Sequence, residues 1–278
     1  GTLFGRNTSA GAISIVTNHP TQENEGELDL RLGNNGLTYV YGLYNLPVTD
    51  SSAVRISYVS NQSDGWIKDA ATGKYLNPED NWATKVAWRT TFGNGTVLDF
   101  TWDHEVVDQL ARPAIGVVPM FGPADGPYTP PFPAKDYTDT YLNPKTVPVY
   151  NDVVNNNEQR TFDGFTLQLY HSFEWASATY SASYRSFDTS NREDEDGTNH
   201  TATYLDTENV ETNSSFYQEL KFNGYAGSVD WVAGISYSTE DATQTSYVNA
   251  FTNSINTLYN NTIGFPLFDT MQAALGGA

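Results

Sequence analysis

The stretch NWATKVAWRTTFGNGTVLDFTWDHEV, residues 81–106, holds two runs in which apolar and polar residues alternate. In residues 81–92 the tryptophans, valine and phenylalanine share one parity, and lysine and arginine share the other. In residues 96–106 leucine, phenylalanine, tryptophan and valine alternate with threonine and acidic residues. Because strand side chains point alternately to two faces, each run predicts a strand with one apolar and one polar face. The Gly-Asn-Gly between the runs supplies the positive φ angles that a tight hairpin needs.

The polar faces of these two predicted strands carry opposite charges. Lys85 and Arg89 lie on the first strand, and Asp99, Asp103 and Glu105 lie on the second. Antiparallel pairing through the short turn brings both sets to one face of the sheet, so we expect ion pairs across the strands.

The same alternation recurs along the rest of the chain. Together with the hairpin it predicts about nine strands, most of them long for a soluble sheet. The other predicted strands are residues 25–34, 36–46, 54–61, 165–173, 178–185, 216–222 and 229–237.

The connections between the predicted strands alternate between short and long. The short ones lie at 47–52, 93–95, 174–176 and 225–227, and the long ones lie at 64–80, 107–157, 191–208 and after Gln244. A transmembrane barrel has short turns at one end and long loops at the other, and its strands need ~9–11 residues to cross the membrane. The pattern therefore predicts an all-β fold and favours an antiparallel transmembrane β-barrel, although adhesins, passenger β-helices and sugar-binding sandwiches also contain long polar strands. The connection at 33–36 departs from the pattern, because it is short where a long one is expected.

The composition argues against several classes of protein. A formal net charge of −19 over 278 residues disfavours nucleic acid as a partner, because phosphate binding needs clustered Lys and Arg. The chain has no Cys, which excludes disulfides, thiolate catalysis and Cys-type metal sites. It has no nucleophile elbow, P-loop or His-Glu-x-x-His motif, and its four His show no paired ligand spacing. We therefore expect no enzyme activity, no catalytic residues and no cofactor.

One acidic run, REDEDG at residues 192–197, invites a comparison with calcium-binding loops. The EF-hand pattern requires Asp at its first position and Glu at its twelfth. Here those positions hold Arg192 and Thr203, so the motif fails. We expect a solvated acidic loop and no metal site, with loose binding of divalent cations at a lipopolysaccharide surface left open.

The first twenty residues, GTLFGRNTSAGAISIVTNHP, are a glycine-rich segment that leads into a strand-like run. They resemble the end of the plug domain of TonB-dependent outer-membrane receptors, where a Gly-x-x-Phe/Tyr-Gly-x-x-small-Gly-x-Ile-x-Ile-x-Thr pattern precedes the first barrel strand. Glycines there allow the plug backbone to pack closely inside the barrel. Ala10-Gly11 replaces the paired glycine of the family, a mild departure. The matching residues are Gly1, Leu3, Phe4, Gly5, Arg6, Gly11, Ile13, Ile15 and Thr17.

The resemblance continues along most of the chain, in family order. NLPVTDSSAVRISY, residues 45–58, is similar to the family's second strand, first periplasmic turn and third strand. SDGW at 63–66 is similar to the polar-Asp-Gly-aromatic step of the next loop. FYQELKF at 216–222 and DWVAGISY at 230–237 are similar to two later strands of the family, with Lys221 in place of an Arg.

The resemblance implies that the chain is a fragment of such a receptor. Residues 1–20 are then the C-terminal end of the plug, and residues 21–278 the N-terminal part of the barrel, with about nine of its ~22 strands. The signal peptide, the energy-coupling box and the remainder of plug and barrel lie outside it. Within the plug, Arg6 is expected to form an ordinary ion pair with a lumen carboxylate such as Asp99 or Asp103. The expected plug motif is Gly1, Phe4, Gly5, Arg6 and Gly11.

The resemblance also implies active uptake at the outer membrane of a Gram-negative bacterium. Such receptors bind a scarce solute from outside, and the inner-membrane TonB complex, driven by the proton gradient, pulls on the plug and releases it inward. The implied partners are a small-molecule ligand, the TonB complex acting through the absent N-terminal region, membrane lipid and lipopolysaccharide. A ferric siderophore or a similar iron complex is the expected solute, with an oligosaccharide or a vitamin as alternatives.

The ligand-binding residues are expected in the long connection at 107–157. Its prolines stiffen it, and its aromatic side chains either stack on a planar ligand or pack on one another. The loop at 191–209 carries one Arg against six acidic residues, which disfavours strongly anionic iron complexes. The candidate ligand-binding residues are Tyr128, Phe132, Tyr137 and Tyr141.

Two other classes of function remain as alternatives. A secreted or surface β-rich adhesin or carbohydrate-binding protein also has long polar strands. A passive porin-like channel has no plug, and the glycine-rich residues 1–18 disfavour it.

Overall fold

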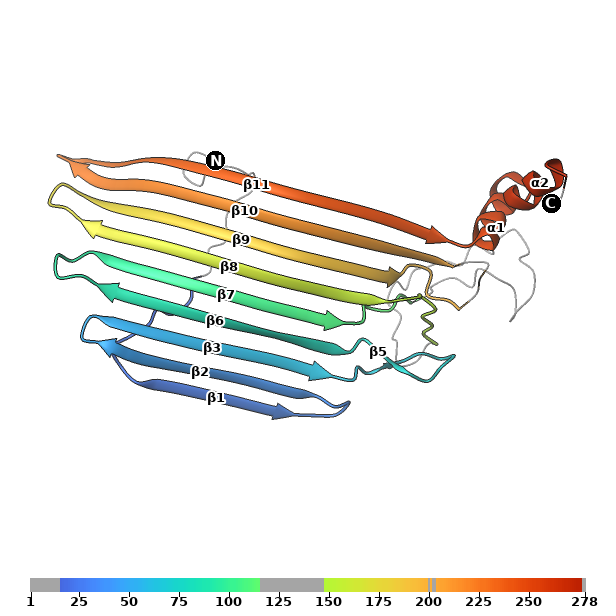
Figure 1. Ribbon diagram of the computed structural model, residues 1–278, viewed down its shortest axis with the longest axis horizontal. Helices are drawn as coiled ribbons and strands as arrows, with labels where there is room; N and C mark the ends of the chain where they lie inside the picture. The colour runs from blue at the N-terminus through green and yellow to red at the C-terminus, as the bar shows by residue number, and fades with distance from the viewer. Residues whose placement is uncertain (1–15, 116–147, 200, 202–203, 277–278) are drawn as a thin grey trace.

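The computed structural model describes residues 16–115, 148–199, 201 and 204–276. Among these residues nine strands form one sheet, in which each strand pairs antiparallel with the next (Figure 1). The prediction of about nine antiparallel strands is therefore confirmed. The strands are β1 (Glu25–Leu32), β2 (Thr38–Thr49), β3 (Ser52–Ser63), β6 (Glu79–Thr91), β7 (Val97–Gln109), β8 (Asn157–Ser172), β9 (Ala176–Asp194), β10 (Leu205–Ala226) and β11 (Val229–Ala250).

The last three strands extend beyond their predicted ends. β9 runs to Asp194, β10 begins at Leu205 and β11 runs to Ala250. The predicted bounds of the loop at 191–208 and of the connection after Gln244 are therefore wrong. The polar ends of these strands stay paired in register, because backbone hydrogen bonds hold a ladder where apolar alternation has already stopped.

The sheet has one apolar and one polar face. Trp102 on β7 lies opposite Val86 on β6 and Phe165 on β8, and these residues share the apolar face. The next residue, Asp103, lies opposite Lys85 and belongs to the polar face. Large side chains of the apolar face remain exposed among the described residues, including Leu28 (69%), Ile56 (48%) and Ile235 (74%).

The two ends of the sheet differ in their connections, as the sequence predicted. At one end, the turn end, short turns join β2 to β3, β6 to β7, β8 to β9 and β10 to β11 (Figure 1). At the other end, the loop end, lie the longer connections from β3 to β6, β7 to β8 and β9 to β10 (Figure 1). The predicted exception is also present, because the short β1–β2 turn lies at the loop end (Figure 1).

A small core lies at the loop end. The β3–β6 connection contains the hairpin of β4 (Ile67–Lys68) and β5 (Tyr75–Leu76). Ile67, Leu76 and Val149 form the cluster of buried apolar side chains found in the described part of the chain, with Ile115 packed against it. The sheet therefore relies on its ladder, and not on a buried core, for most of its length.

Two short helices, α1 (Thr252–Ile263) and α2 (Leu267–Ala274), follow β11 where the sequence analysis expected a connection. Gly264 ends α1 with a φ of 85°, in the left-handed region that glycine tolerates. Asn256 of α1 joins the two helices, because its side chain donates to Asp269 and accepts the Phe268 N–H. In the described part of the chain, no helix has the length and apolarity that a membrane span requires.

Candidate functional site

The polar face carries the ion pairs that the sequence predicted. Arg89 makes two hydrogen bonds to Asp99, at 2.7 Å from Nε and 2.8 Å from Nη2. The Nζ of Lys85 lies 3.3 Å from Oδ1 of Asp103. Both pairs join residues that are directly opposite in the β6–β7 register, so the expectation of cross-strand ion pairs is confirmed.

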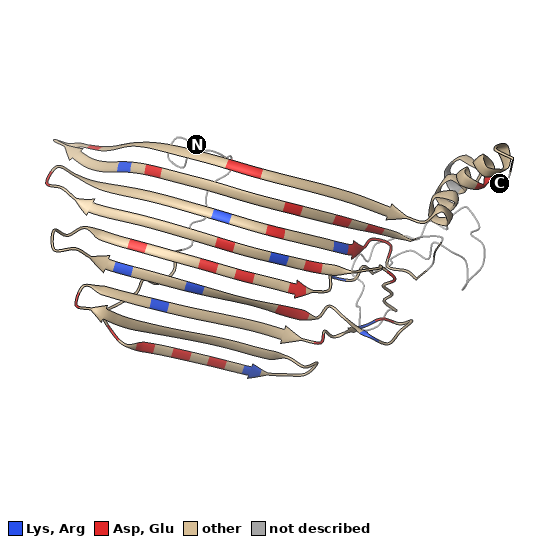
Figure 2. Ribbon diagram, in the orientation of Figure 1, with Lys and Arg blue, Asp and Glu red and all other residues tan. Residues whose placement is uncertain are grey.

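The third acidic residue of that strand pairs with the next strand. Nη2 of Arg160 on β8 donates to Oε1 of Glu105 at 2.6 Å. Figure 2 shows acidic and basic residues distributed along neighbouring strands. The expected pairing of Arg6 lies outside the described residues, and both candidate carboxylates, Asp99 and Asp103, already have basic partners on β6.

The start of the described chain lies against the polar face. Residues 16–18 line a cavity of ≈ 340 Å³ together with Tyr41, Arg55 and Lys85. Nδ1 of His19 lies 3.5 Å from Oδ1 of Asp99. The segment that follows the predicted plug motif is therefore on the face that the sequence analysis assigned to the lumen.

Asn45 fixes the chain where it enters β1. Its side chain is fully buried, at 0% exposure. It accepts the Thr21 N–H at 3.0 Å and donates to the carbonyl oxygens of Thr21 at 2.9 Å and Glu23 at 2.5 Å. These bonds set the direction in which the chain passes from the polar face into the first strand.

Aromatic rings gather at the turn end. Trp175, in the β8–β9 turn, stacks with Phe173, Phe222 and Trp231 at centroid distances of 5.9, 6.1 and 6.2 Å. Trp175 is nevertheless 62% exposed and Tyr225 is 79% exposed. Exposed aromatic rings near the strand ends are typical of barrels that place them at the membrane interface.

At the loop end, Asp69 joins the β4–β5 hairpin to the segment that precedes β8. Its Oδ1 accepts the N–H groups of Ala71 and Thr72 at 2.7 and 2.8 Å, and its Oδ2 accepts the Asn151 N–H at 3.2 Å. Asp69 also forms a parallel bridge with Val149. The backbone of residues 149–151 is thus fixed against the hairpin.

A buried ion pair joins the loop-end parts of β9 and β10. Arg192 donates to both carboxylate oxygens of Asp206, each at 3.0 Å, and Asp206 is 0% exposed. Tyr204 and Asn249 also donate to Asp206. Burial acts to raise the pKa of Asp206, but the hydrogen bonds from Arg192, Tyr204 and Asn249 outweigh it and hold that pKa below its ordinary value.

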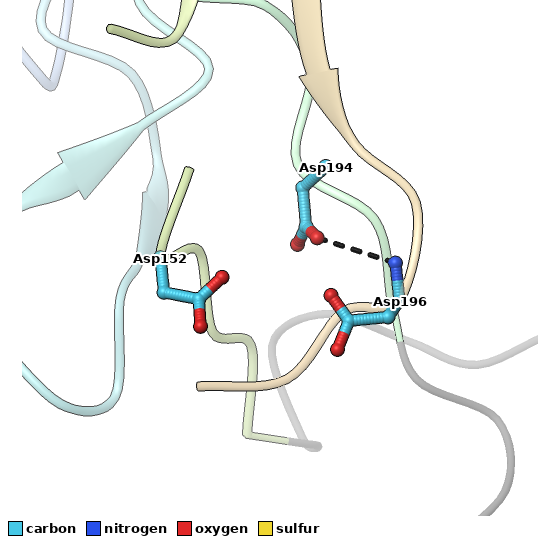
Figure 3. A group of neighbouring side chains, drawn as sticks. All are labelled: Asp152, Asp194 and Asp196. Atoms are coloured by element: carbon cyan, nitrogen blue, oxygen red, sulfur yellow. Dashed lines mark hydrogen bonds between the residues drawn. The ribbon is translucent and has the colours of Figure 1, made fainter. Parts of the chain in front are cut away.

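Three further carboxylates converge at the loop end (Figure 3), and one of them, Asp194, lies opposite Asp206 in the β9–β10 register. One oxygen each of Asp152, Asp194 and Asp196 lies within 4.8 Å of the others. Burial, with the neighbouring Asp196 carboxylate, raises the pKa of Asp194 to about 8. The sequence analysis singled out the run that contains Asp194 and Asp196 but missed Asp152, which lies far from them along the chain.

The predicted site residues lie outside the described part of the chain. These are the plug motif, Gly1, Phe4, Gly5, Arg6 and Gly11, and the candidate ligand-binding residues, Tyr128, Phe132, Tyr137 and Tyr141. They stay predictions.

No family model and no curated protein matches the sequence. Solved structures do match the fold. The ferric-catecholate import receptor Fiu of E. coli K12, in its closed form, matches with a TM-score of 0.62 and 14% identity over 88% of this chain. The chain has the fold of a siderophore-receptor barrel wall. The siderophore receptor PiuA of Acinetobacter baumannii matches with a TM-score of 0.56 and 11% identity over 82% of this chain.

These matches confirm the resemblance to TonB-dependent receptors at the level of the fold. The chain spans about a third of either receptor, 35% of Fiu and 32% of PiuA. Both matched proteins are named as receptors.

Proposed function

We propose that this chain is part of a TonB-dependent receptor that imports a scarce solute across the outer membrane of a Gram-negative bacterium. In this proposal residues 1–20 close the plug and residues 21–278 form the N-terminal part of the barrel. The observation that carries it is the sheet itself, with an exposed apolar face, an ion-paired polar face, and short turns at one end. A soluble sheet buries its apolar face, whereas a membrane barrel turns that face to lipid.

The proposed partners follow from the two faces and the two ends. Lipid contacts the apolar face, and lipopolysaccharide surrounds the loop end. The plug occupies the polar face, where residues 16–18 already line a cavity with Tyr41 and Lys85. The TonB complex acts through a region outside this chain.

The proposed solute is an iron complex of low negative charge. The receptors with the same fold are named for ferric catecholates and siderophores, which supports an iron complex. The loop end of the described chain is acidic, because Asp64, Glu79, Asp80 and Asp108 line one cavity there, and such a field repels strongly anionic complexes. Stacking on Tyr128, Phe132, Tyr137 and Tyr141 completes the proposed binding.

The test is uptake of ⁵⁵Fe by cells in which the gene for the complete protein is deleted and then restored. We expect deletion to abolish energy-dependent uptake of an uncharged ferric hydroxamate and to leave uptake of an anionic ferric tricatecholate unchanged. A protonophore should abolish the restored uptake. Unchanged iron uptake together with lost growth on an oligosaccharide or a vitamin contradicts the iron proposal, and recovery of the protein in the soluble secreted fraction contradicts the receptor proposal.

A further inference from the structure

The carboxylates of Asp152, Asp194 and Asp196 come from two separate segments at the loop end (Figure 3). Asp194 is the last residue of β9, and Asp196 follows it in the connection to β10. Asp152 precedes β8 and comes directly after the backbone that Asp69 holds against the β4–β5 hairpin. The three side chains therefore meet across a contact between segments, with an oxygen of each within 4.8 Å of the others.

Backbone N–H groups that follow Asp194 orient its carboxylate. Its Oδ1 accepts the N–H groups of Asp196 at 3.2 Å and Gly197 at 3.3 Å. Gly197 turns the chain with a φ of 63°. The Asp196 side chain faces Asp152 (Figure 3). The second oxygen of Asp194, Oδ2, is left to face the cluster.

Two buried oxygens of this cluster, one on Asp194 and one on Asp196, lack hydrogen-bond donors. Asp194 is 4% exposed, and its Oδ2 is buried with no hydrogen-bond partner. Oδ1 of Asp196 is likewise buried with no hydrogen-bond partner. A buried carboxylate oxygen is costly unless a donor or a cation satisfies it, so the oxygens point to a missing positive group.

We propose that Asp152, Asp194 and Asp196 bind a calcium ion. Calcium takes 6–8 oxygen ligands at about 2.3–2.6 Å, so two ligand atoms on opposite sides of it lie up to about 5 Å apart, which accommodates this cluster. Carboxylate oxygens are hard ligands, and the cluster contains no imidazole or thiolate that favours zinc. Backbone carbonyls and water complete the coordination shell.

The ion joins the end of β9 to the segment that leads into β8. It therefore holds the segment before β8 against the end of β9. Sites of this kind at cell surfaces bind calcium with a Kd of about 10⁻⁴–10⁻³ M, which is the affinity we expect. This assignment stands on the cluster and on its two buried oxygens that lack donors, and it does not depend on the proposed transport function.

The test is calcium binding to the complete protein, purified in detergent without lipopolysaccharide and treated with EDTA. Titration with CaCl₂, followed by equilibrium dialysis with ⁴⁵Ca, should show a saturable site. Asp194→Asn and Asp196→Asn should each weaken that site at least tenfold. Asp188→Asn removes an exposed carboxylate from the same strand and should leave it unchanged.

Thermal unfolding is an independent test of calcium binding. CaCl₂ should raise the melting temperature of the wild type and of Asp188→Asn, and should leave that of Asp194→Asn unchanged. Asparagine has the shape of aspartate and removes a buried charge, so Asp194→Asn is expected to fold. If it misfolds, Asp196→Asn provides the same comparison of melting temperatures. Equal melting in CaCl₂ and EDTA, or calcium binding that survives both substitutions, would overturn the proposal and leave a proton shared between Asp194 and Asp196 as the explanation.

Discussion

The turn end and the loop end of the sheet are stabilised in opposite ways. At the turn end, Trp175 stacks on three neighbouring rings and is still 62% exposed. At the loop end, Asp206 is fully buried and satisfied by hydrogen bonds from three different side chains. The turn end leaves aromatic surface exposed to its surroundings, whereas the loop end is stabilised by hydrogen bonds between polar side chains of the chain itself.

This difference follows from what each end of a barrel strand meets. Strands beyond the hydrocarbon region lie in water, where an apolar face is no longer favoured and side chains pair with each other. The apolar set of β10 ends near Phe216, and the remainder of the strand toward Leu205 carries polar residues on both faces. The ladder continues, and in the proposed membrane barrel its stabilisation changes from lipid contact to internal hydrogen bonding.

The largest expected effect is at the buried pair of the loop end. Asp206→Ala leaves Arg192 without its partner and should lower the free energy of unfolding by about 3–5 kcal/mol. Glu208→Ala removes the next acidic residue on the same face of β10 and should change it by less than about 1 kcal/mol. Urea unfolding in lipid vesicles measures both. If the two substitutions lower the free energy of unfolding equally, the loop end does not depend on its internal polar network.

The second-largest expected effect distinguishes the apolar face of the sheet from the polar face. Leu220→Arg places a charge on the apolar face and should cost about 2–4 kcal/mol in vesicles, because a lipid-facing Arg is unfavourable near the membrane centre. Ser181→Arg lies at almost the same height on the polar face, opposite Glu219, and should cost little. The same urea titration distinguishes them. If Ser181→Arg is the more costly change, the assignment of the two faces is wrong.

A smaller effect is expected at the turn end. Trp175→Ala removes three stacked ring contacts and should cost about 1–2 kcal/mol. Glu174→Ala, at the adjacent exposed position, serves as the matched control and should be close to neutral. Because the ring is mostly exposed, the loss should be larger in vesicles than in a short-chain detergent. A loss that is independent of the surroundings would argue against an interfacial role.

The smallest effect is a dependence on pH at the loop end. The folded-state pKa of Asp206 lies below its ordinary value, so its stabilisation is fully present above about pH 4 and is lost as pH falls through the lowered pKa. Melting temperatures of the wild type and of Asp206→Asn, measured from pH 7 to pH 3, should converge in acid. Curves that remain parallel would show that Asp206 has no lowered pKa.

The strands were predictable where apolar and polar residues alternate. Their lengths were underestimated where this alternation stops. Trp82, Trp88 and Trp102 mark one face so clearly that the hairpin, its register and its ion pairs all follow from the sequence. The loop-end parts of β9–β11 carry no such signal, because polar residues occupy both of their faces. The two helices after β11 were missed because neither carries a side-chain N-cap that marks its start.

The clusters at the loop end were predictable only in part. The acidic run at 192–197 was visible, but its spacing resembles no calcium loop. Arg192 pairs with Asp206 only through the β9–β10 register, and Asp152 reaches Asp194 only because Asp69 fixes the segment before β8. Sites assembled from separate segments leave no spacing signature in a sequence.

The most direct test of the account is the accessibility of the two ends in intact cells. The chain contains no Cys, so Glu195→Cys at the loop end and Asn94→Cys at the turn end can each be labelled with a membrane-impermeant maleimide, with the parent protein labelled in parallel. We predict that Glu195→Cys is labelled in intact cells and that Asn94→Cys is labelled only after the outer membrane is permeabilised. Labelling of both positions in intact cells, or of Asn94→Cys alone, would contradict a sheet that crosses the outer membrane with its loop end outward.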